Sequence, residues 1–364
     1  MFSIFKNYPD RKGITVNKVR IGFVGVGFMG QKAHLSNYAA LDDCEIVAIA
    51  EPRVQLAEKV ARRYGVEKVY KNHRELLENC EVDAIVAAQP YRHHINIVPD
   101  ILKAGKPLFT EKPLALSVES GEYLAQLADE KGVIYMVGYH KRSDPAMEYA
   151  KNLVDEWKAT GEYGKLRYIR ITMPPGDWVG GAGDAITSDE PYPEIQLEPD
   201  APYFDKETAQ AYDSFVNYYI HQVNALRFLF GEPYKVTHAD SSGVLLVARS
   251  DSGVTGIIEM ALYENTIDWQ ESILVCFEKG YVKIELPPPL ASQQPGRVTV
   301  MMDGGKEEPV TVQPALPRIH AMKKQAMNFL AAVRKERPAP CEAREAVGDL
   351  KIARDYILMH RSKL

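Results

Sequence analysis

Cysteine is scarce in this sequence and is not arranged for cross-linking or metal binding. The 364 residues include four cysteines, scattered with no CxxC pair and no Cys/His ligand spacing: Cys44, Cys80, Cys276 and Cys341. This pattern argues against a disulfide framework and a zinc site, and it is typical of a reducing compartment. We therefore expect no metal in the functional site.

Long apolar runs and an excess of basic charge are also missing. No run approaches the ~18 apolar residues of a membrane span, and the N-terminal MFSIFKNYPDRKG lacks the apolar core of a signal peptide. The formal net charge is −5, so the chain has no basic footprint for nucleic acid or an anionic membrane. These absences predict a cytoplasmic protein without nucleic-acid or membrane partners.

The chain is long enough for two domains, and one stretch of it is strongly acidic. A length of 364 residues exceeds the usual size of a single core. Nine acidic residues but only one basic residue, Lys206, lie between Gly176 and Gln210. This Pro/Gly-rich stretch, 174–209, is too long for a passive connection, so we interpret it as a lid or an insertion.

The most informative segment is 18–30, which reads KVRIGFVGVGFMG. A short, mostly apolar run ends in a glycine-rich turn, and a helix-like run follows from Gln31 to Leu41. In a GxGxxG turn the first glycine permits the tight turn, the second lets the backbone approach a pyrophosphate, and the third permits close helix–strand packing. An ordinary strand–turn–helix is the alternative. We expect a dinucleotide to bind along this turn, at Gly25, Gly27, Phe28, Met29 and Gly30.

A second apolar run, 45–50, ends at Glu51, 21 residues after Gly30. An acid at this distance accepts hydrogen bonds from the ribose hydroxyls of adenosine. It also repels a 2′-phosphate, so Glu51 favours NAD over NADP. Arg53, two residues further on, is expected in the same pocket and could soften that preference.

Strand-like and helix-like segments alternate up to about residue 137. The helices are expected at 31–41, 53–64, 74–79, 93–104 and 117–131. Short, mostly apolar strands are expected at 45–50, 83–88, 107–110 and 133–137. This alternation predicts an α/β domain with a doubly wound parallel sheet of the Rossmann type, at 17–143.

The pattern changes after Arg142. Period-two strands with Asp/Gly/Ser turns dominate 234–312, after a strand at 165–173, and helices are expected at 145–160, 211–230, 319–335 and 342–360. We expect an α+β domain at 144–364 with a large, mostly antiparallel open sheet that binds substrate and joins subunits. Its last helices could pack back on the first domain.

Ligands of doubly wound sheets bind at the carboxyl ends of the strands. Three polar stretches follow strands here: Gln89-Pro90 with His94 beyond, Glu111-Lys112-Pro113, and His140-Lys141-Arg142. A lysine beside the nicotinamide can donate to a substrate hydroxyl oxygen or stabilise the developing alkoxide. A Lys-Pro pair can equally be an ordinary turn.

The helix expected at 211–230 carries a second group of polar residues. Asp213, Asn217 and His221 are spaced i, i+4, i+8, so they share one helix face ~12 Å long, with Asn224 one turn beyond. Histidine is suited to reversible proton transfer near neutral pH. The alternative is a solvated or intersubunit stripe.

Together these motifs resemble the Gfo/Idh/MocA oxidoreductases, the group of glucose–fructose oxidoreductase and inositol dehydrogenase. The resemblance covers nearly the whole chain and rests on the order of its motifs: GVGFMG (25–30), Glu51, QPYRHH (89–94), EKP (111–113), GYHKRSDP (138–145), the histidine helix ending in GEP (231–233) and the two closing helices. It implies that Lys112 and His221 are catalytic. It further implies that His94 lies near the nicotinamide or pyrophosphate and Arg142 near the interdomain cleft.

The sequence departs from the family pattern at two places. Family members commonly carry Asp four residues before the catalytic histidine, where this chain has Asn217. An amide can orient a substrate hydroxyl but cannot raise the basicity of His221, so the acid could come from Asp213 or from the acidic stretch. That stretch, longer than usual, contains Trp178, whose indole could stack on a sugar ring; a solvated loop is equally compatible.

The resemblance implies an NAD-dependent enzyme that oxidises or reduces a secondary alcohol of a sugar, sugar derivative or inositol. The cofactor contacts are expected at the glycine turn and at Glu51, Arg53, Gln89, Pro90, His94, Glu111 and Lys112. The substrate contacts are expected at Lys112, His140, Arg142, Trp178, Asn217 and His221, with Asn217 joining the catalytic pair.

Two alternatives to this function stay open. One is elimination, hydrolysis or epimerisation through a transient keto intermediate, without net redox change; the other is a nucleotide-binding regulator. A homodimer or homotetramer is expected.

Overall fold

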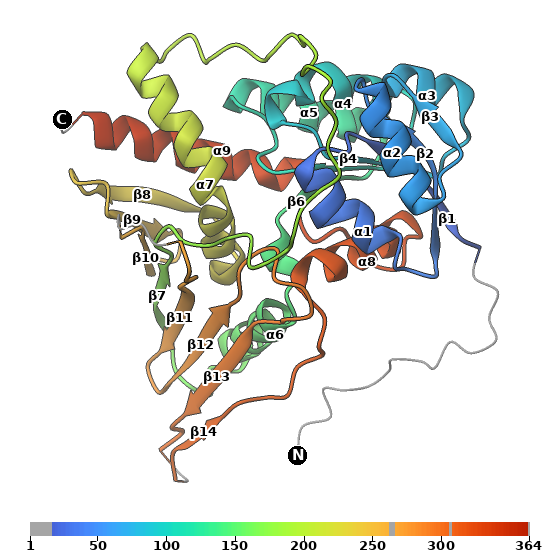
Figure 1. The fold of residues 1–364 in the computed structure, drawn as a ribbon. Coiled ribbons are helices and arrows are strands. Elements are labelled where there is room, and N and C mark those ends of the chain that lie inside the picture. The colour runs from blue at the N-terminus through green and yellow to red at the C-terminus, as the bar shows by residue number, and fades with distance from the viewer. Residues whose placement is uncertain (1–16, 262–265, 306–307, 363–364) are drawn as a thin grey trace.

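The computed structural model describes residues 17–261, 266–305 and 308–362. Its first half is built on a parallel sheet of six strands in the order β3-β2-β1-β4-β5-β6 (Figure 1). These strands are β1 (Val19–Val24), β2 (Cys44–Ala50), β3 (Lys68–Tyr70), β4 (Ala84–Ala87), β5 (Leu108–Glu111) and β6 (Tyr135–Gly138). The strand order reverses between β1 and β4, so the predicted doubly wound sheet is confirmed and its ligand crevice lies at that reversal.

Helices connect these strands: η1 (Gly30–Leu35), α1 (Ser36–Tyr38), α2 (Val54–Tyr64), α3 (His73–Asn79), α4 (His94–Lys103) and α5 (Val118–Lys131). The helix after the glycine turn differs from expectation, because η1 is a π-helix and α1 ends at Tyr38 rather than Leu41. The N–H of Ser36 donates to the carbonyl of Gln31, and this i→i−5 bond defines the wider turn. The short edge strand β3 was not expected from the sequence.

The second sheet has eight strands in the order β14-β13-β12-β11-β7-β10-β9-β8. They are β7 (Leu166–Thr172), β8 (Tyr234–Ala239), β9 (Leu245–Ser250), β10 (Thr255–Glu259), β11 (Glu271–Phe277), β12 (Gly280–Leu286), β13 (Arg297–Met302) and β14 (Val310–Val312). Among the described strands of this sheet, β7 and β10 alone pair in parallel, which confirms the mostly antiparallel sheet. Side chains of β11 and β12 alternate between buried and partly exposed, so one face of this sheet is packed and the other is open.

Two helices cover the packed face, α6 (Pro145–Thr160) and α7 (Lys206–Phe230). α7 begins five residues before the expected Ala211, because Asp205 caps it by accepting a hydrogen bond from the N–H of Thr208 at 2.7 Å. The last four residues of the expected insertion are therefore helical. Residues 174–205 contain no helix or strand.

The closing helices connect the two halves. α8 (Ala321–Val333) contacts α1 and the 3₁₀ turn η3 (His140–Ser143), while α9 (Ala343–Arg361) contacts α5, α7 and β8. Within the part of the chain that the structure describes, no helix combines the length and apolarity needed to cross a membrane.

Candidate active site

A continuous cavity of about 1220 Å³ lies along the carboxyl ends of β1, β2, β4, β5 and β6 and extends to α7. Its lining runs from Gly25 and Glu51, through Gln89 and Lys112, to His221 on α7. The cavity is larger than the few hundred Å³ that a single small molecule needs, so it has room for a dinucleotide and a substrate end to end.

The glycine turn has the backbone geometry that a dinucleotide needs. Gly25 has a φ of +87°, a conformation that side chains disfavour. A Cβ on Gly30 would lie 2.5 Å from the carbonyl oxygen of Gly25, so only glycine allows this close packing. Gly27, Phe28 and Met29 line the cavity between them.

Glu51 and Arg53 form a pair at the end of β2. The Glu51 carboxylate is buried, accepts a hydrogen bond from the N–H of Val26 at 3.0 Å, and accepts another from the Arg53 guanidinium at 2.7 Å. Donating this hydrogen bond to Glu51 raises the pKa of Arg53 above its ordinary value. Both side chains line the cavity, where they can meet the adenosine ribose.

At the end of β4, the Gln89 side chain has no partner among the described residues. Both polar atoms of its amide are buried without a hydrogen bond, and it lines the cavity beside Pro90. A buried unpaired amide facing a cavity is a ready hydrogen-bonding group for a ligand. With the glycine cradle, it indicates that the residues present fit a dinucleotide.

His94 is not among the residues that line the cavity. It is fully buried, its Nδ1 lies 3.0 Å from the carbonyl oxygen of Leu114, and burial lowers its pKa to about 4. His93, its neighbour, lines the cavity instead. The placement of His94 at the cofactor is therefore corrected: a helix start presents adjacent residues in different directions, and position in the sequence does not decide which one faces the ligand.

Lys112 directly precedes Pro113, and the peptide bond between them is cis. Its Nζ donates a hydrogen bond to the backbone carbonyl of Asn217 on α7 at 2.5 Å. Burial lowers the pKa of Lys112 to about 8, which the neighbouring Glu111 partly opposes. Glu111 in turn lies 2.6 Å from Nε2 of His34. Lys112 therefore reaches from the first sheet to α7 inside the cavity.

His221 faces the same region from α7. Its ring lies edge-on to that of His140, with centroids 4.5 Å apart, and Tyr139 lies beyond at 5.9 Å. Burial lowers the pKa of His221 well below its ordinary value, and His140, Lys112 and Lys141 lower it further. Nδ1 of His221 is buried without a partner among the described residues. The imidazole is thus neutral at neutral pH and able to accept a proton.

No acid pairs with His221 in the described structure. Asp213 instead accepts hydrogen bonds from the Tyr91 hydroxyl and forms an ion pair with Arg92 at 3.3 Å. The possibility that Asp213 supplies the missing carboxylate is therefore excluded in this conformation. Asn217 lines the cavity one turn before His221, in the position that the helix spacing predicts.

A buried ion pair beside the histidines was not anticipated from the sequence. Nζ of Lys141 lies 2.5 Å from the Glu271 carboxylate on β11, and Gln222 donates to the other Glu271 oxygen at 2.8 Å. Lys141 also lies over the Trp269 ring at 5.7 Å. Lys141 stood in the polar stretch after β6, but its partner is 130 residues away, and no local pattern links the two.

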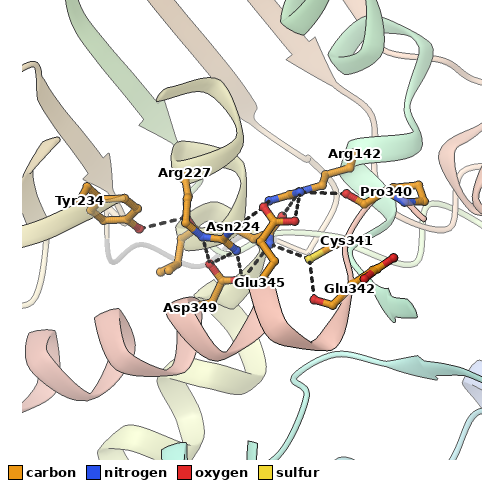
Figure 2. A network of polar contacts seen from close by, with 10 residues as sticks. Arg142, Asn224, Arg227, Tyr234, Pro340, Cys341, Glu342, Glu345 and Asp349 are labelled. Atoms are coloured by element: carbon orange, nitrogen blue, oxygen red, sulfur yellow. Dashed lines mark hydrogen bonds and ion pairs between the residues drawn. The ribbon is translucent and has the colours of Figure 1, made fainter. Parts of the chain in front are cut away.

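Arg142 lies outside the cavity, so its assignment to the substrate is corrected. Figure 2 shows its guanidinium enclosed by a polar network with α7 and α9, where it pairs with Glu345 at 2.6 Å and donates to the Asn224 side chain at 2.6 Å. Adjacent residues of η3 point in different directions, so Lys141 reaches the cavity while Arg142 is directed to α9.

Two further features complete the cavity. Trp178, from the acidic stretch, lines it and lies edge-on to Phe28 with ring centroids 6.0 Å apart. Across the described ranges 17–261, 266–305 and 308–362, no three His, Cys, Asp or Glu side chains are grouped to hold a metal ion.

Known proteins resemble this chain in sequence and in fold. Residues 19–139 match a family described as "Oxidoreductase family, NAD-binding Rossmann fold". The chain is 27% identical over 262 residues to scyllo-inositol 2-dehydrogenase (NAD(+)) of Bacillus subtilis, covering 67% of each chain. It is 26% identical over 260 residues to Myo-inositol 2-dehydrogenase of Thermotoga maritima, covering 66% of this chain and 68% of that protein.

Among solved structures, aldose-aldose oxidoreductase from Caulobacter crescentus superposes with a TM-score of 0.71 at 18% identity. The match covers 96% of this chain and 99% of that one. The two proteins therefore share the whole two-sheet fold.

Proposed function

We propose that this chain, a member of the Gfo/Idh/MocA family of NAD(P)-dependent oxidoreductases, oxidises a secondary alcohol of a sugar, sugar derivative or inositol with NAD. Two relatives bear the names of inositol 2-dehydrogenases, which supports a polyhydroxylated substrate. We further propose that the chain divides into a dinucleotide-binding domain, 17–143, and a substrate-binding domain, 144–364. A cytoplasmic location stays a prediction.

One observation carries the proposal: Lys112 and His221 come from different halves of the molecule and face one cavity. Lys112 bonds to the backbone of Asn217, one helical turn before His221, and that cavity continues to the glycine turn and Glu51. A substrate oxygen between the two side chains would lie at the end of the dinucleotide cavity.

The charge states of the pair suit alcohol oxidation. A bound nicotinamide supplies the chemistry of hydride acceptance. His221 is held neutral by burial and takes the hydroxyl proton, while protonated Lys112 stabilises the negative charge that develops on the oxygen. Asn217, with no acid beside it, orients a second hydroxyl. In the reverse direction His221 returns this proton to the oxygen, and protonated Lys112 again stabilises its negative charge.

NAD is the proposed cofactor, with NADP disfavoured. Glu51 places a buried carboxylate where the ribose diol binds and a 2′-phosphate would be repelled. Arg53 is already bonded to Glu51, which limits its attraction for phosphate.

Replacing either member of the pair tests the mechanism. Lys112→Met and His221→Asn should each lower turnover by ~100- to 10,000-fold, the range for a positioned acid–base group. NADH affinity, measured by fluorescence titration, should stay nearly unchanged because neither residue contacts the phosphates or ribose. The double variant should lose much less than the product of the two single losses. Full turnover in both single variants on the true substrate would refute the proposal.

A second candidate is supported by the segment 174–205, which contributes Trp178, Tyr192 and Glu194 to the lining of the cavity. The segment is also hydrogen-bonded to the side chain of Gln31 and to the start of α2. Such a covering favours a reaction in which the cofactor stays bound while a transient keto group enables elimination, hydrolysis or epimerisation. Turnover without release of free NADH, with nucleotide retained through purification, would favour this candidate over net oxidation.

A further inference from the structure

The segment 174–205, here termed the strap, lies along the nucleotide edge of the first sheet. Figure 1 shows it leaving β7, running past α1 and returning above α4 and α5 to the start of α7. Its backbone at Ile186 exchanges two hydrogen bonds of 2.9 Å with the Gln31 side chain. Further along, the Glu198 carboxylate is buried and accepts hydrogen bonds from the N–H groups of Leu116 and Ser117 at the start of α5.

Between these two attachments, Glu190 binds the start of α2. Its carboxylate oxygens accept hydrogen bonds from the N–H groups of Gln55 at 3.0 Å and Leu56 at 2.9 Å, and Ser188 donates to it at 2.9 Å. Although partial burial opposes ionisation, the hydrogen bonds from Gln55 and Leu56 lower the pKa of Glu190. The strap thus supplies an anion to the first turn of a helix of 11 residues.

The start of α2 adjoins the end of the cavity where the ribose binds. Arg53 is the residue that precedes α2; its guanidinium bonds to Glu51 and lies 4.8 Å from the ring centroid of Tyr192, also on the strap. Glu51, Arg53 and Tyr192 all line the cavity. If Glu190 were absent, the N–H groups at the start of α2 would be free and would lie beside an arginine. These are the groups that would bind a phosphate on the 2′-oxygen of this ribose.

We propose that Glu190 determines cofactor specificity by occupying this anion site and excluding the 2′-phosphate of NADP. The inference rests on the proposed function, because it assumes that the cavity binds a nicotinamide dinucleotide. It goes further in assigning part of the NAD preference to a residue outside the first sheet. Glu51, at the end of β2, repels the 2′-phosphate. Glu190, on the strap, accepts the hydrogen bonds of the N–H groups that would otherwise bind that phosphate.

Direct binding measurements on Glu190 variants test this assignment. NADH and NADPH are titrated against the wild type, Glu190→Ala and Glu190→Gln, with cofactor fluorescence as the readout. Glu190→Ala removes both the charge and the occupant, so NADPH should bind at least ~10-fold more tightly than in the wild type, from relief of like-charge repulsion. NADH affinity should change by less than ~3-fold, because NADH has no phosphate on the 2′-oxygen and is not repelled by Glu190. Glu190→Gln, which retains the side-chain shape, should give a smaller gain in the same direction.

Two further variants separate this role from simpler ones. Asp189→Asn removes one charge from the exposed neighbouring position and should leave both affinities unchanged, which rules out a general effect of strap charge. Glu198→Gln loosens the strap at α5 without emptying the α2 site, so it should shift both cofactors alike.

The assignment is overturned if Glu190→Ala changes NADH and NADPH affinities by the same factor, which would mean that Glu190 only fastens the strap. It is also overturned if Asp189→Asn reproduces the NADPH gain. A wild-type protein that binds NADPH as tightly as NADH would instead refute the NAD preference of the proposed function, and a wild type that binds neither would refute the dinucleotide site itself.

Discussion

At the scale of single residues, the site is defined by the charge states of two groups. Burial lowers the pKa of Lys112 to about 8. It also lowers the pKa of His221 well below its ordinary value, so the imidazole is neutral near neutral pH. Near neutral pH, the base is therefore deprotonated and the cation is mostly protonated. Both are in the states that alcohol oxidation requires.

This arrangement predicts the shape of the pH profile. Because protonated Lys112 stabilises the developing alkoxide, kcat for oxidation should fall as the pH rises through about 8. Lys112→Arg should turn over more slowly at neutral pH but lose this basic limb, since a guanidinium stays protonated throughout the range. Steady-state rates between pH 6 and pH 10 provide the measurement. A basic limb that persists unchanged in Lys112→Arg would assign it to another group.

Asn217 offers a second test, because its backbone binds Lys112 while its side chain lines the cavity. If the amide orients a substrate hydroxyl, Asn217→Ala should raise KM more than it lowers kcat. Asn217→Asp introduces a carboxylate one turn from His221 and should raise the pKa of the imidazole. The acid limb of the profile should then move to higher pH with kcat preserved or increased. An unmoved acid limb would show that residue 217 does not communicate with His221.

The sequence anticipated residues whose role follows from local geometry, and missed those that depend on distant partners. The glycine turn, Glu51, Lys112 and His221 could be identified because each lies at a fixed offset from a strand end or along a helix. Arg142 was misassigned because its direction is decided by Glu345 on α9, about 200 residues away in the chain. Such pairings arise only when the whole molecule packs.

At the scale of elements, the histidine helix α7 is fixed by buried charges. Figure 2 shows Asn224 and Arg227 of α7 bound to Asp349 of α9, which is fully buried, with Arg142 joining through Glu345. Asn224 lies less than one turn from His221, so this network also sets the position of the proposed base. Because one partner comes from η3, it ties the first sheet to α7.

Removing the central carboxylate should therefore destabilise the fold. Asp349→Ala leaves the largely buried Arg227 without the carboxylate that binds it through both oxygens, and it should lower the free energy of unfolding by about 3–5 kcal/mol. Asp355→Ala, on the same helix but half exposed, should cost only about 0–1 kcal/mol. Urea denaturation of both variants gives the comparison. Equal losses would mean that the network does not stabilise the junction.

For the strap, the sequence predicts the irregular structure of the segment but not its path across the molecule. Its acidic composition and lack of periodicity indicated an irregular segment over 174–209, and the structure differs only in the last residues, which join α7. Its path could not be predicted, because Glu190 and Glu198 bind helix N-termini that lie far from them in sequence. A solvated loop and a strap can have the same composition, and they are distinguished by the tertiary hydrogen bonds that the strap forms.

At the scale of the whole molecule, the described helices cover one face of the eight-stranded sheet and leave the other open. Its other face carries partly exposed apolar side chains between polar ones: Tyr168, Leu245, Val247, Ile257, Leu274, Tyr281 and Met301. Extended apolar surfaces of this kind are usually covered by a partner. We therefore predict that two copies of the chain associate through this face, as a homodimer or as a dimer of dimers.

Charge placed on the open face should separate the copies. Leu274 lies on β11 near the middle of the sheet, so Leu274→Asp would put an unpaired carboxylate into an interface across this face, at a cost of several kcal/mol. The wild type should show the mass of a dimer or tetramer by light scattering at micromolar concentration, and Leu274→Asp should shift it to the monomer. Ile267→Asp is the matched control, because Ile267 is 91% exposed and lies outside the strands. It should leave the mass unchanged. A monomeric wild type would remove the prediction, whereas an oligomer that survives Leu274→Asp would assign the contact to another surface.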